Sequence, residues 1–371
     1  MSAKSSRTWV KDFGGAFADA AILFPLLAAL STSNAGLAGG TLLLTAGLAY
    51  WIAGAVFRVP MPVQPLKSIA IAALALGASG TEIRVSGALL GVACLLLLFT
   101  RAETWAARVP TVIIHSMQVG LGVLLITQGL KTLPGGSELY FFMLVAAMFA
   151  VPYLTQFPLL GWVAAAGLLY GVLRADSPQV GAGGPPPELR DLRPGMIAAL
   201  VFPQLALTLA NSVVGTRQAA QRYFGRGAER VTVPRLLSVI GLGNLVSSLV
   251  GGLPFCHGAG GLTAHVRGGA TTARMNWIIG GLLVTLAGFH FFVGGTAIRI
   301  PPLLVAALLA VTGIFHILLA EESWRQSPWL RIQVIAAAAV SLATHNLLWV
   351  LGSSVALTLL LKKRPAHDPV Y

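Results

Sequence analysis

Charged residues are scarce in this chain of 371 residues: only 10% are Asp, Glu, Lys or Arg, whereas 56% are hydrophobic. A soluble protein carries about a quarter charged residues, and the mean hydropathy here is +0.79. The composition therefore excludes an ordinary soluble domain and indicates a polytopic helical membrane protein. The two cysteines, Cys94 and Cys256, lie in apolar segments of different halves, so a disulfide framework is not expected.

Acidic residues are fewer than basic ones, with 12 Asp and Glu against 25 Lys and Arg. The sequence also lacks a nucleophile–base pair, a Walker loop and a cluster of metal ligands. His115, His290, His316 and His345 occur singly and are expected to be packed helix residues. We therefore predict no enzyme activity, no catalytic residues, no metal and no cofactor.

Fourteen apolar runs are suitable for membrane spans, although several are short. They lie near 13–30, 38–57, 62–78, 83–100, 111–130, 139–155, 157–173, 195–214, 236–253, 256–272, 275–294, 299–319, 328–344 and 346–361. With a cytoplasmic N-terminus, eighteen basic residues face the cytoplasm and six face outside. This positive-inside bias accounts for the net charge of +13 without nucleic acid. It predicts a multi-pass protein of the cell (inner) membrane with both termini cytoplasmic.

The two halves of the sequence resemble each other at a nearly constant offset. Arg108-Val-Pro110 matches Arg299-Ile-Pro301, 191 positions later, and Gly122 and Gly313 keep that offset. Seven spans per repeat is an odd number, so the second copy enters the membrane from the opposite side. The expected fold is all-α, about fourteen transmembrane segments in a 7+7 inverted repeat.

The predicted boundaries follow from composition. Residues 1–173 form the first seven-helix repeat, the Pro/Gly-rich stretch 174–194 an extracellular linker, and residues 195–371 the second repeat. The Arg-rich stretch 216–234 is expected to be a cytoplasmic interfacial segment. Because only ten residues follow Leu361, no soluble regulatory domain is expected.

Two spans are broken in the same way, at Val59–Ser68 and at Leu253–Gly261. In lipid, non-helical backbone survives only where protein or a watery cavity satisfies it, and a matched pair of breaks points to the central site of a transporter. Pro62 and Pro65 exclude regular helix before about Leu66. A helix over residues 66–78 is roughly 20 Å long, too short for a core of about 30 Å. Two half-helices are therefore expected to meet at mid-membrane.

The N-terminus of each half-helix offers free N–H groups and about half a positive charge. Together with Lys67, the only Lys or Arg deep in the membrane, they give roughly +2, which suits a divalent anion. The alternative is that Lys67 snorkels to an interface or pairs with Asp19. The predicted substrate-binding residues are Gln64, Lys67, Ser68, Gln204, Asn211, Ser212, Cys256, His257, Gly258, Ala259, Gly260 and Gly261.

Several of these residues have a second interpretation. Asp19, the one acidic residue well inside a span, is a candidate for proton coupling or for a structural ion pair. Asn211 and Ser212 line one face of a helix and either face the site or join helices. His257 is a ligand or proton acceptor, or it only orders the loop.

The broken segments also resemble a known family. The carrying motifs are Pro62-Val-Gln-Pro-Leu-Lys-Ser-Ile-Ala70, Phe202-Pro-Gln-Leu-Ala-Leu-Thr-Leu-Ala-Asn-Ser-Val-Val214, Pro254-Phe-Cys-His-Gly-Ala-Gly-Gly-Leu262, and Gly15-Ala-Phe-Ala-Asp19 through Phe24-Pro25. They are similar to the molybdate transporter family related to the SulP sulfate permeases. The resemblance implies the fourteen-helix fold shared with SulP and uracil permeases, with core and gate domains, and often a homodimer.

The same resemblance implies import of an oxyanion, with molybdate favoured over its relatives sulfate and tungstate. The missing cytoplasmic STAS domain fits the molybdate branch better than SulP. We therefore expect a secondary active molybdate transporter, with proton symport as the candidate form of coupling. The alternatives are a sulfate or other oxyanion transporter and a passive anion channel.

Overall fold

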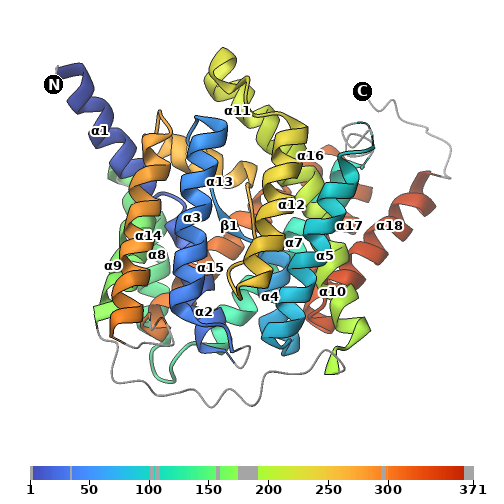
Figure 1. Cartoon of the computed structure of the whole chain (residues 1–371). Coiled ribbons are helices and arrows are strands. Elements are labelled where there is room, and N and C mark those ends of the chain that lie inside the picture. The colour runs from blue at the N-terminus through green and yellow to red at the C-terminus, as the bar shows by residue number, and fades with distance from the viewer. Residues whose placement is uncertain are drawn as a thin grey trace.

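The structure is a computed structural model that describes residues 3–33, 36–100, 104, 109–155, 159–173, 191–293, 298 and 300–362. Helices make up most of this part of the chain, with two short strands at its centre (Figure 1). Most of the predicted linker 174–194, residues 174–190 with Gly183, lies outside the described residues, as do Arg108 and Arg299 of the repeat motif.

The elements follow the predicted spans closely. The first half contains α1 (Ala3–Ala16), α2 (Ala20–Thr32), α3 (Gly39–Phe57), β1 (Gln64–Pro65), α4 (Lys67–Leu76), α5 (Gly80–Leu97), α7 (Thr111–Lys131), α8 (Glu138–Thr155) and α9 (Leu159–Leu173). The second half contains α10 (Pro194–Leu207), the π-helix η2 (Thr208–Gly215), α11 (Thr216–Phe224), the 3₁₀ helix η3 (Gly225–Ala228), α12 (Val233–Leu249), β2 (Phe255–Cys256), α13 (Ala259–Arg267), α14 (Arg274–Phe292), α15 (Pro302–Leu318), α16 (Glu321–Gln326), α17 (Pro328–Thr344) and α18 (Leu347–Lys362).

Six helical stretches of the described chain are long and apolar enough to cross a membrane unaided, and seven shorter apolar helices accompany them. The half-helix α4 is one of these shorter helices. Counting α1–α2 and α10–α11 as one segment each, and including the half-helices α4 and α13, the chain forms fourteen membrane segments in a 7+7 inverted repeat. The predicted fold class is confirmed.

Pairs of glycines mark the crossings that relate the two repeats. A β-carbon on Gly122 of α7 would lie 2.5 Å from the carbonyl oxygen of Gly313 on α15, and the reverse distance is also 2.5 Å. Gly47 and Gly280 face each other in the same way where α3 packs on α14. Gly91 and Gly241 repeat this arrangement where α5 packs on α12. Small residues let helix backbones approach closely in a membrane, so these crossings fix the repeat geometry.

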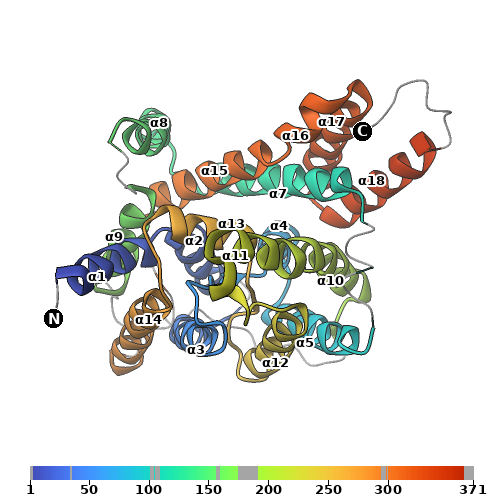
Figure 2. The same cartoon turned by 90° about the horizontal axis from the view of Figure 1, so that it is seen from above.

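The helices form two groups. Seen from above, α7, α15, α17 and α18 form a row along one side (Figure 2). The helices α2 to α5 and α10 to α14 gather beside it (Figure 2). We call these groups the gate row and the core bundle. The core bundle carries both breaks.

The two breaks pair with each other as antiparallel strands. Gln64 of β1 lies opposite Cys256 of β2, and Pro65 lies opposite Phe255. An asparagine from a neighbouring helix supports each break by bonding both the backbone N–H and the backbone C=O of one residue. The Asn276 side chain donates to Met61 O (2.6 Å) and accepts from Met61 N (3.0 Å). The Asn244 side chain donates to Phe255 O (2.7 Å) and accepts from Phe255 N (2.8 Å). These bonds satisfy backbone groups that lipid could not.

Two sequence expectations differ from the structure. The first span is not one helix, because α1 ends at Ala16 and α2 starts at Ala20. Asp19 therefore lies at the N-cap position of α2, without a side-chain capping bond, instead of lying mid-helix. The stretch from Thr216 is not a separate interfacial segment at its start, because α11 continues directly from α10 through η2. In Figure 1, α11 projects beyond the core bundle at the end where α1 lies.

A buried acid joins the two repeats at the opposite end of the bundle. Glu82, whose side chain is 2% exposed, forms an ion pair with Arg193 at 2.7 Å. It also accepts from the backbone N–H of Ser79 in a capping box, and Arg193 donates to Gly77 O (2.9 Å). Arg84 lies on the same helix, α5, as Glu82 and donates to Ser248 O (2.8 Å). Arg84 and Arg193, two of the six basic residues that the topology assigns to the outside, therefore lie at the same end of the bundle.

Candidate substrate site

The two half-helices start on either side of the paired strands. α4 begins at Lys67 directly after β1, and α13 begins at Ala259 two residues after β2 ends. The strand pairing therefore brings both helix N-termini to one place at mid-depth of the core bundle, as Figure 1 indicates for β1. The first peptide N–H groups of a helix have no partner inside it, so this place concentrates free donors and positive potential.

Gln64 connects the break to Asp19. Its side-chain nitrogen donates to both carboxylate oxygens of Asp19 at 2.7 Å. Both residues are buried, and the amide oxygen of Gln64 has no hydrogen-bond partner. An unsatisfied buried oxygen is costly, which is typical of a site built for a further partner.

Lys67 stands at the first position of α4 and is only 7% exposed. It interacts electrostatically with Asp19 and Cys256. Within the described residues, however, no ion pair within 4 Å joins Lys67 to an acid. Burial at a half-helix start argues against snorkelling to an interface, and the ammonium is left close to the helix ends.

Gln204 and Ser68 meet at the start of α4. The amide oxygen of Gln204 accepts from Ser68 N (2.9 Å), and its nitrogen donates to Thr208 Oγ1 (3.1 Å). Gln204 thus accepts from one of the free N–H groups at the start of α4. Without Gln204, this N–H group would be available to an anion. The Ser68 hydroxyl is buried and has no partner. Of these two, Ser68 is the one with a free polar atom.

The π-helix η2 places Asn211 and Ser212 beside the second break. Ser212 is buried and its side chain hydrogen-bonds Cys256. Asn211 is half-buried, and its side-chain nitrogen would lie 3.2 Å from a β-carbon on Gly258. Wide helical turns of this kind are frequent at functional sites. Both residues therefore reach the break, with Asn211 the more accessible.

His257 holds the breaks together. Its Nδ1 lies 2.7 Å from Pro62 O, and its carbonyl oxygen accepts from Thr216 Oγ1. Because a carbonyl only accepts, Nδ1 carries the proton in this contact. The ring lies against Phe57 and Phe255, and Nε2 is buried without a partner.

The glycines of the second break are not equivalent. A β-carbon on Gly258 would lie 2.4 Å from Gln64 Oε1, and one on Gly261 would lie 2.5 Å from Gln64 Nε2 and 2.8 Å from Asp19 Oδ2. A β-carbon on Gly260 would meet nothing within 4 Å, and Gly260 is exposed. Ala259 is half-buried. Close approach of backbone thus requires glycine at 258 and 261.

Two histidines near the site were not expected there from the sequence. His265 is buried, its Nδ1 lies 2.7 Å from Gly15 O, and it interacts electrostatically with Asp19. His316 of α15 is buried and interacts electrostatically with Lys67. A single histidine in an apolar run carries no signal of its neighbours, so only the packing reveals them.

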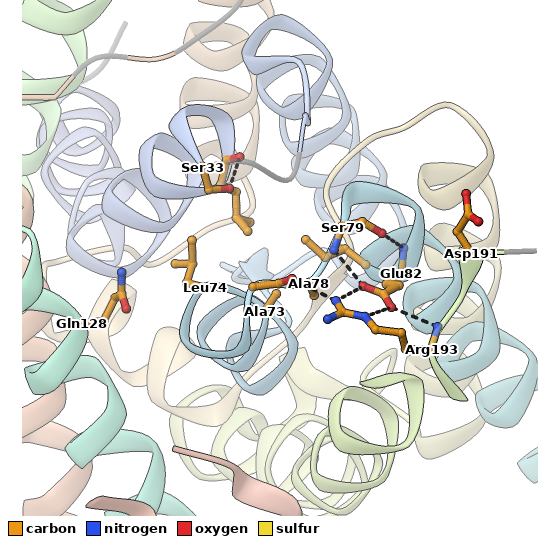
Figure 3. A pocket seen from close by; sticks show the side chains of 12 residues that line it. Ser33, Ala73, Leu74, Ala78, Ser79, Glu82, Gln128, Asp191 and Arg193 are labelled. Atoms are coloured by element: carbon orange, nitrogen blue, oxygen red, sulfur yellow. Dashed lines mark hydrogen bonds and ion pairs between the residues drawn. The ribbon is translucent and has the colours of Figure 1, made fainter. Parts of the chain in front are cut away.

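A cavity of about 570 Å³ lies elsewhere, between α4, α5 and α7. Figure 3 shows its lining, with Gln128 on one side and the Glu82–Arg193 pair on the other. It borders α4 from Ala73 onward, six residues or about 9 Å along the helix from Lys67. The cavity therefore lies toward the end of the bundle that carries Arg193 and is separate from the residues assembled at the breaks.

The described residues contain no group of three or more His, Cys, Asp or Glu arranged to hold a metal ion. The chemistry assembled at the breaks is a lysine ammonium, two helix N-termini and unsatisfied side-chain atoms of Gln64 and Ser68. That combination is chemically suited to an anion.

Comparisons with known proteins agree with this chemistry. The model of a family described as "Molybdate transporter of MFS superfamily" matches residues 11–125 and 196–315, which include both breaks. Relatives include Molybdate transporter 2 of Arabidopsis thaliana, 26% identical over 95% of this chain and 87% of the relative. Molybdate transporter 1 of Chlamydomonas reinhardtii is 36% identical over 30% of this chain and 23% of the relative.

Similar solved structures include the transmembrane domain of a cyanobacterium bicarbonate transporter, BicA. Its TM-score is 0.63 at 16% identity, covering 94% of this chain and 98% of that one. The murine Slc26a9 anion transporter in the inward-facing state has a TM-score of 0.64 at 14% identity, covering 95% of this chain and 68% of that one. At these identities the likeness concerns the fold.

Proposed function

This chain belongs to the family of molybdate transporters, a family of transport proteins and not of enzymes, and from that premise we propose that it imports molybdate by secondary active transport. The proposed route passes through the paired breaks. The proposed site residues are those that meet there from α2, β1, α4, α10, η2, β2 and α13.

The observation that carries the proposal is a buried lysine at the start of a half-helix. Lys67 is only 7% exposed and has no ion-pair partner within 4 Å in the described part of the chain. Burying an unpaired charge is costly, and an intramembrane charge is retained mainly for function. A tetrahedral dianion between the N-termini of α4 and α13 would supply the negative charge that Lys67 lacks as a partner.

Charge balance supports coupling to a proton. The two helix ends and Lys67 give roughly +2, which an ionised Asp19 reduces to about +1 against the −2 of molybdate. A proton taken up by the site with the anion would restore the balance. We propose symport of molybdate with protons, and Asp19 is our candidate for the coupling residue.

We also propose the cell (inner) membrane as the location, with both termini cytoplasmic, and a homodimer as the assembly. The charge asymmetry of the sequence supports this orientation, with the Arg-rich α11–η3 segment inside and the Glu82–Arg193 pair outside. Native mass spectrometry of the purified protein would test the dimer.

The decisive experiment is uptake by the purified protein in liposomes. We expect labelled molybdate to accumulate against its gradient when an inward proton gradient is imposed, and a protonophore to abolish this accumulation. Competition by unlabelled sulfate and tungstate would rank the anions. Sulfate competing better than molybdate would favour a sulfate transporter, and uptake that only equilibrates would favour a channel.

A further inference from the structure

The site described so far comes entirely from the core bundle. One polar side chain of the gate row also reaches it. His316 of α15 is 6% exposed, and its Nε2 is buried with no hydrogen-bond partner. It interacts electrostatically with Lys67, so its ring lies on the side of α15 that faces the start of α4. A buried polar atom without a partner is costly unless another molecule satisfies it.

A hydrogen bond of Thr312, one turn before His316, shows which way this face of α15 points. Thr312 and His316 are four residues apart and therefore share a face of α15. Thr312 Oγ1 donates to Ala21 O of α2 at 3.4 Å, and Ala21 lies two residues after Asp19. α2 runs outward and α15 runs inward in the fourteen-segment fold. One turn beyond Thr312, about 6 Å along the helix, therefore brings His316 level with the break before α2, where Asp19 lies.

The charged and titratable groups around His316 come from the elements packed on α15. α2 brings Asp19 and α4 brings Lys67. α7 carries His115, whose Nδ1 lies 2.6 Å from Ser323 Oγ. The described titratable side chains of α8 and α9, among them Glu138, Tyr153 and Tyr170, are exposed. Of these groups, Lys67 is the one that interacts electrostatically with His316, and Asp19 is bonded to Gln64.

We propose that His316 is a ligand of the transported oxyanion, contributed by the gate row. It donates a hydrogen bond from Nε2–H to an oxygen of the anion held by Lys67. This inference rests on the proposed function, and it adds a contact between the gate row and the cargo. The anion then connects α15 to α4.

Binding of molybdate to the purified full chain, measured by isothermal titration calorimetry, tests this. A hydrogen bond to a charged group accounts for about tenfold to a hundredfold in affinity. We therefore expect His316→Ala to weaken binding by that factor. His316→Gln keeps one N–H donor and should lose less. His115→Ala, on the neighbouring helix but bonded to Ser323, is the matched control and should bind as wild type does.

Thermal unfolding separates a ligand from a packing residue. Because Nε2 has no protein partner, His316→Gln should not lower the melting temperature of the anion-free protein. It should reduce the rise in melting temperature that molybdate causes, since a ligand stabilises the folded state in proportion to its affinity. Wild-type affinity in both His316 variants, or a lower melting temperature with an unchanged molybdate effect, would overturn the inference. Failure of wild-type protein to bind molybdate would instead overturn the proposed function.

Discussion

At the scale of single residues, Lys67 and Asp19 share one buried environment without forming an ion pair. Gln64 bonds both oxygens of Asp19, and this leaves the Lys67 ammonium available to another anion. A direct Lys67–Asp19 pair would have neutralised both groups and left a site with little attraction for a dianion. By bonding Asp19, the Gln64 amide therefore keeps the Lys67 ammonium unpaired.

The first residue-scale prediction concerns Lys67. Replacing it by Ala leaves about one positive charge at the helix ends against two negative charges. Desolvating that imbalance should weaken molybdate binding by about a hundredfold or more, and Lys67→Arg, which keeps charge but changes shape, should be intermediate. Equilibrium binding of labelled molybdate to the purified variants measures this. Wild-type affinity in a folded Lys67→Ala protein would remove the ammonium from the site.

The second residue-scale prediction concerns Asp19. If it takes up the coupling proton, Asp19→Asn should abolish concentrative uptake in proteoliposomes and spare exchange of labelled for unlabelled molybdate. The amide keeps the size of the side chain and can still accept from Gln64. The control is the amount of folded protein in each preparation. Equal loss of exchange and uptake would show that Asp19 is structural.

At the scale of elements, the breaks are held by antiparallel strand pairing and by the two asparagine clamps. Extended backbone inside a membrane requires every polar group to find a partner, and here the partners come from the other repeat or a neighbouring helix. Gly261 lets α13 approach Gln64 and Asp19 closely. Gly260 faces open space.

This difference gives an element-scale prediction with a matched control. Gly261→Ala places a methyl group 2.5 Å from Gln64 Nε2, closer than atoms tolerate, so the Gln64–Asp19 bond must shift. We expect molybdate uptake to fall at least tenfold, whereas Gly260→Ala should transport as wild type does. Uptake normalised to membrane expression measures both. Two equally active variants would mean that the approach of α13 is unimportant for transport.

At the scale of the whole molecule, the core bundle carries the breaks, and the gate row packs beside it where α15 contacts α2 and α7 contacts α4. The Glu82–Arg193 pair lies at one end of the bundle and the basic α11–η3 segment at the other. Relative motion of the two groups would expose the breaks to one side at a time. This geometry suits alternating access.

The whole-molecule prediction is the orientation. Cysteine introduced at Glu138, an exposed residue at the start of α8, should react with an impermeant maleimide from outside intact cells. Cysteine at Arg226 should react only after permeabilisation. The native Cys94 and Cys256 are buried and give the background. Labelling of both positions from the same side would refute the fourteen-segment topology.

The sequence by itself determined the segments. The apolar run 328–344 has the same ends as α17, and the run 38–57 differs from α3 by one residue. Both half-helices and their breaks also followed from the sequence, because proline removes hydrogen-bond donors and because helices of this length cannot cross the hydrocarbon core. These rules act on neighbouring residues, so no tertiary information was needed.

Only the tertiary structure decided which polar groups meet. The break at residues 17–19 and the role of Gln204 in capping α4 depend on contacts with residues far along the chain. The same is true of His316, which interacts electrostatically with Lys67, and of the contrast between Gly260 and Gly261. In a soluble helix an apolar stripe would mark the inner face. In a membrane both faces are apolar, so the sequence does not say which side of a helix faces protein, lipid or substrate. The packing of the two repeats makes that choice.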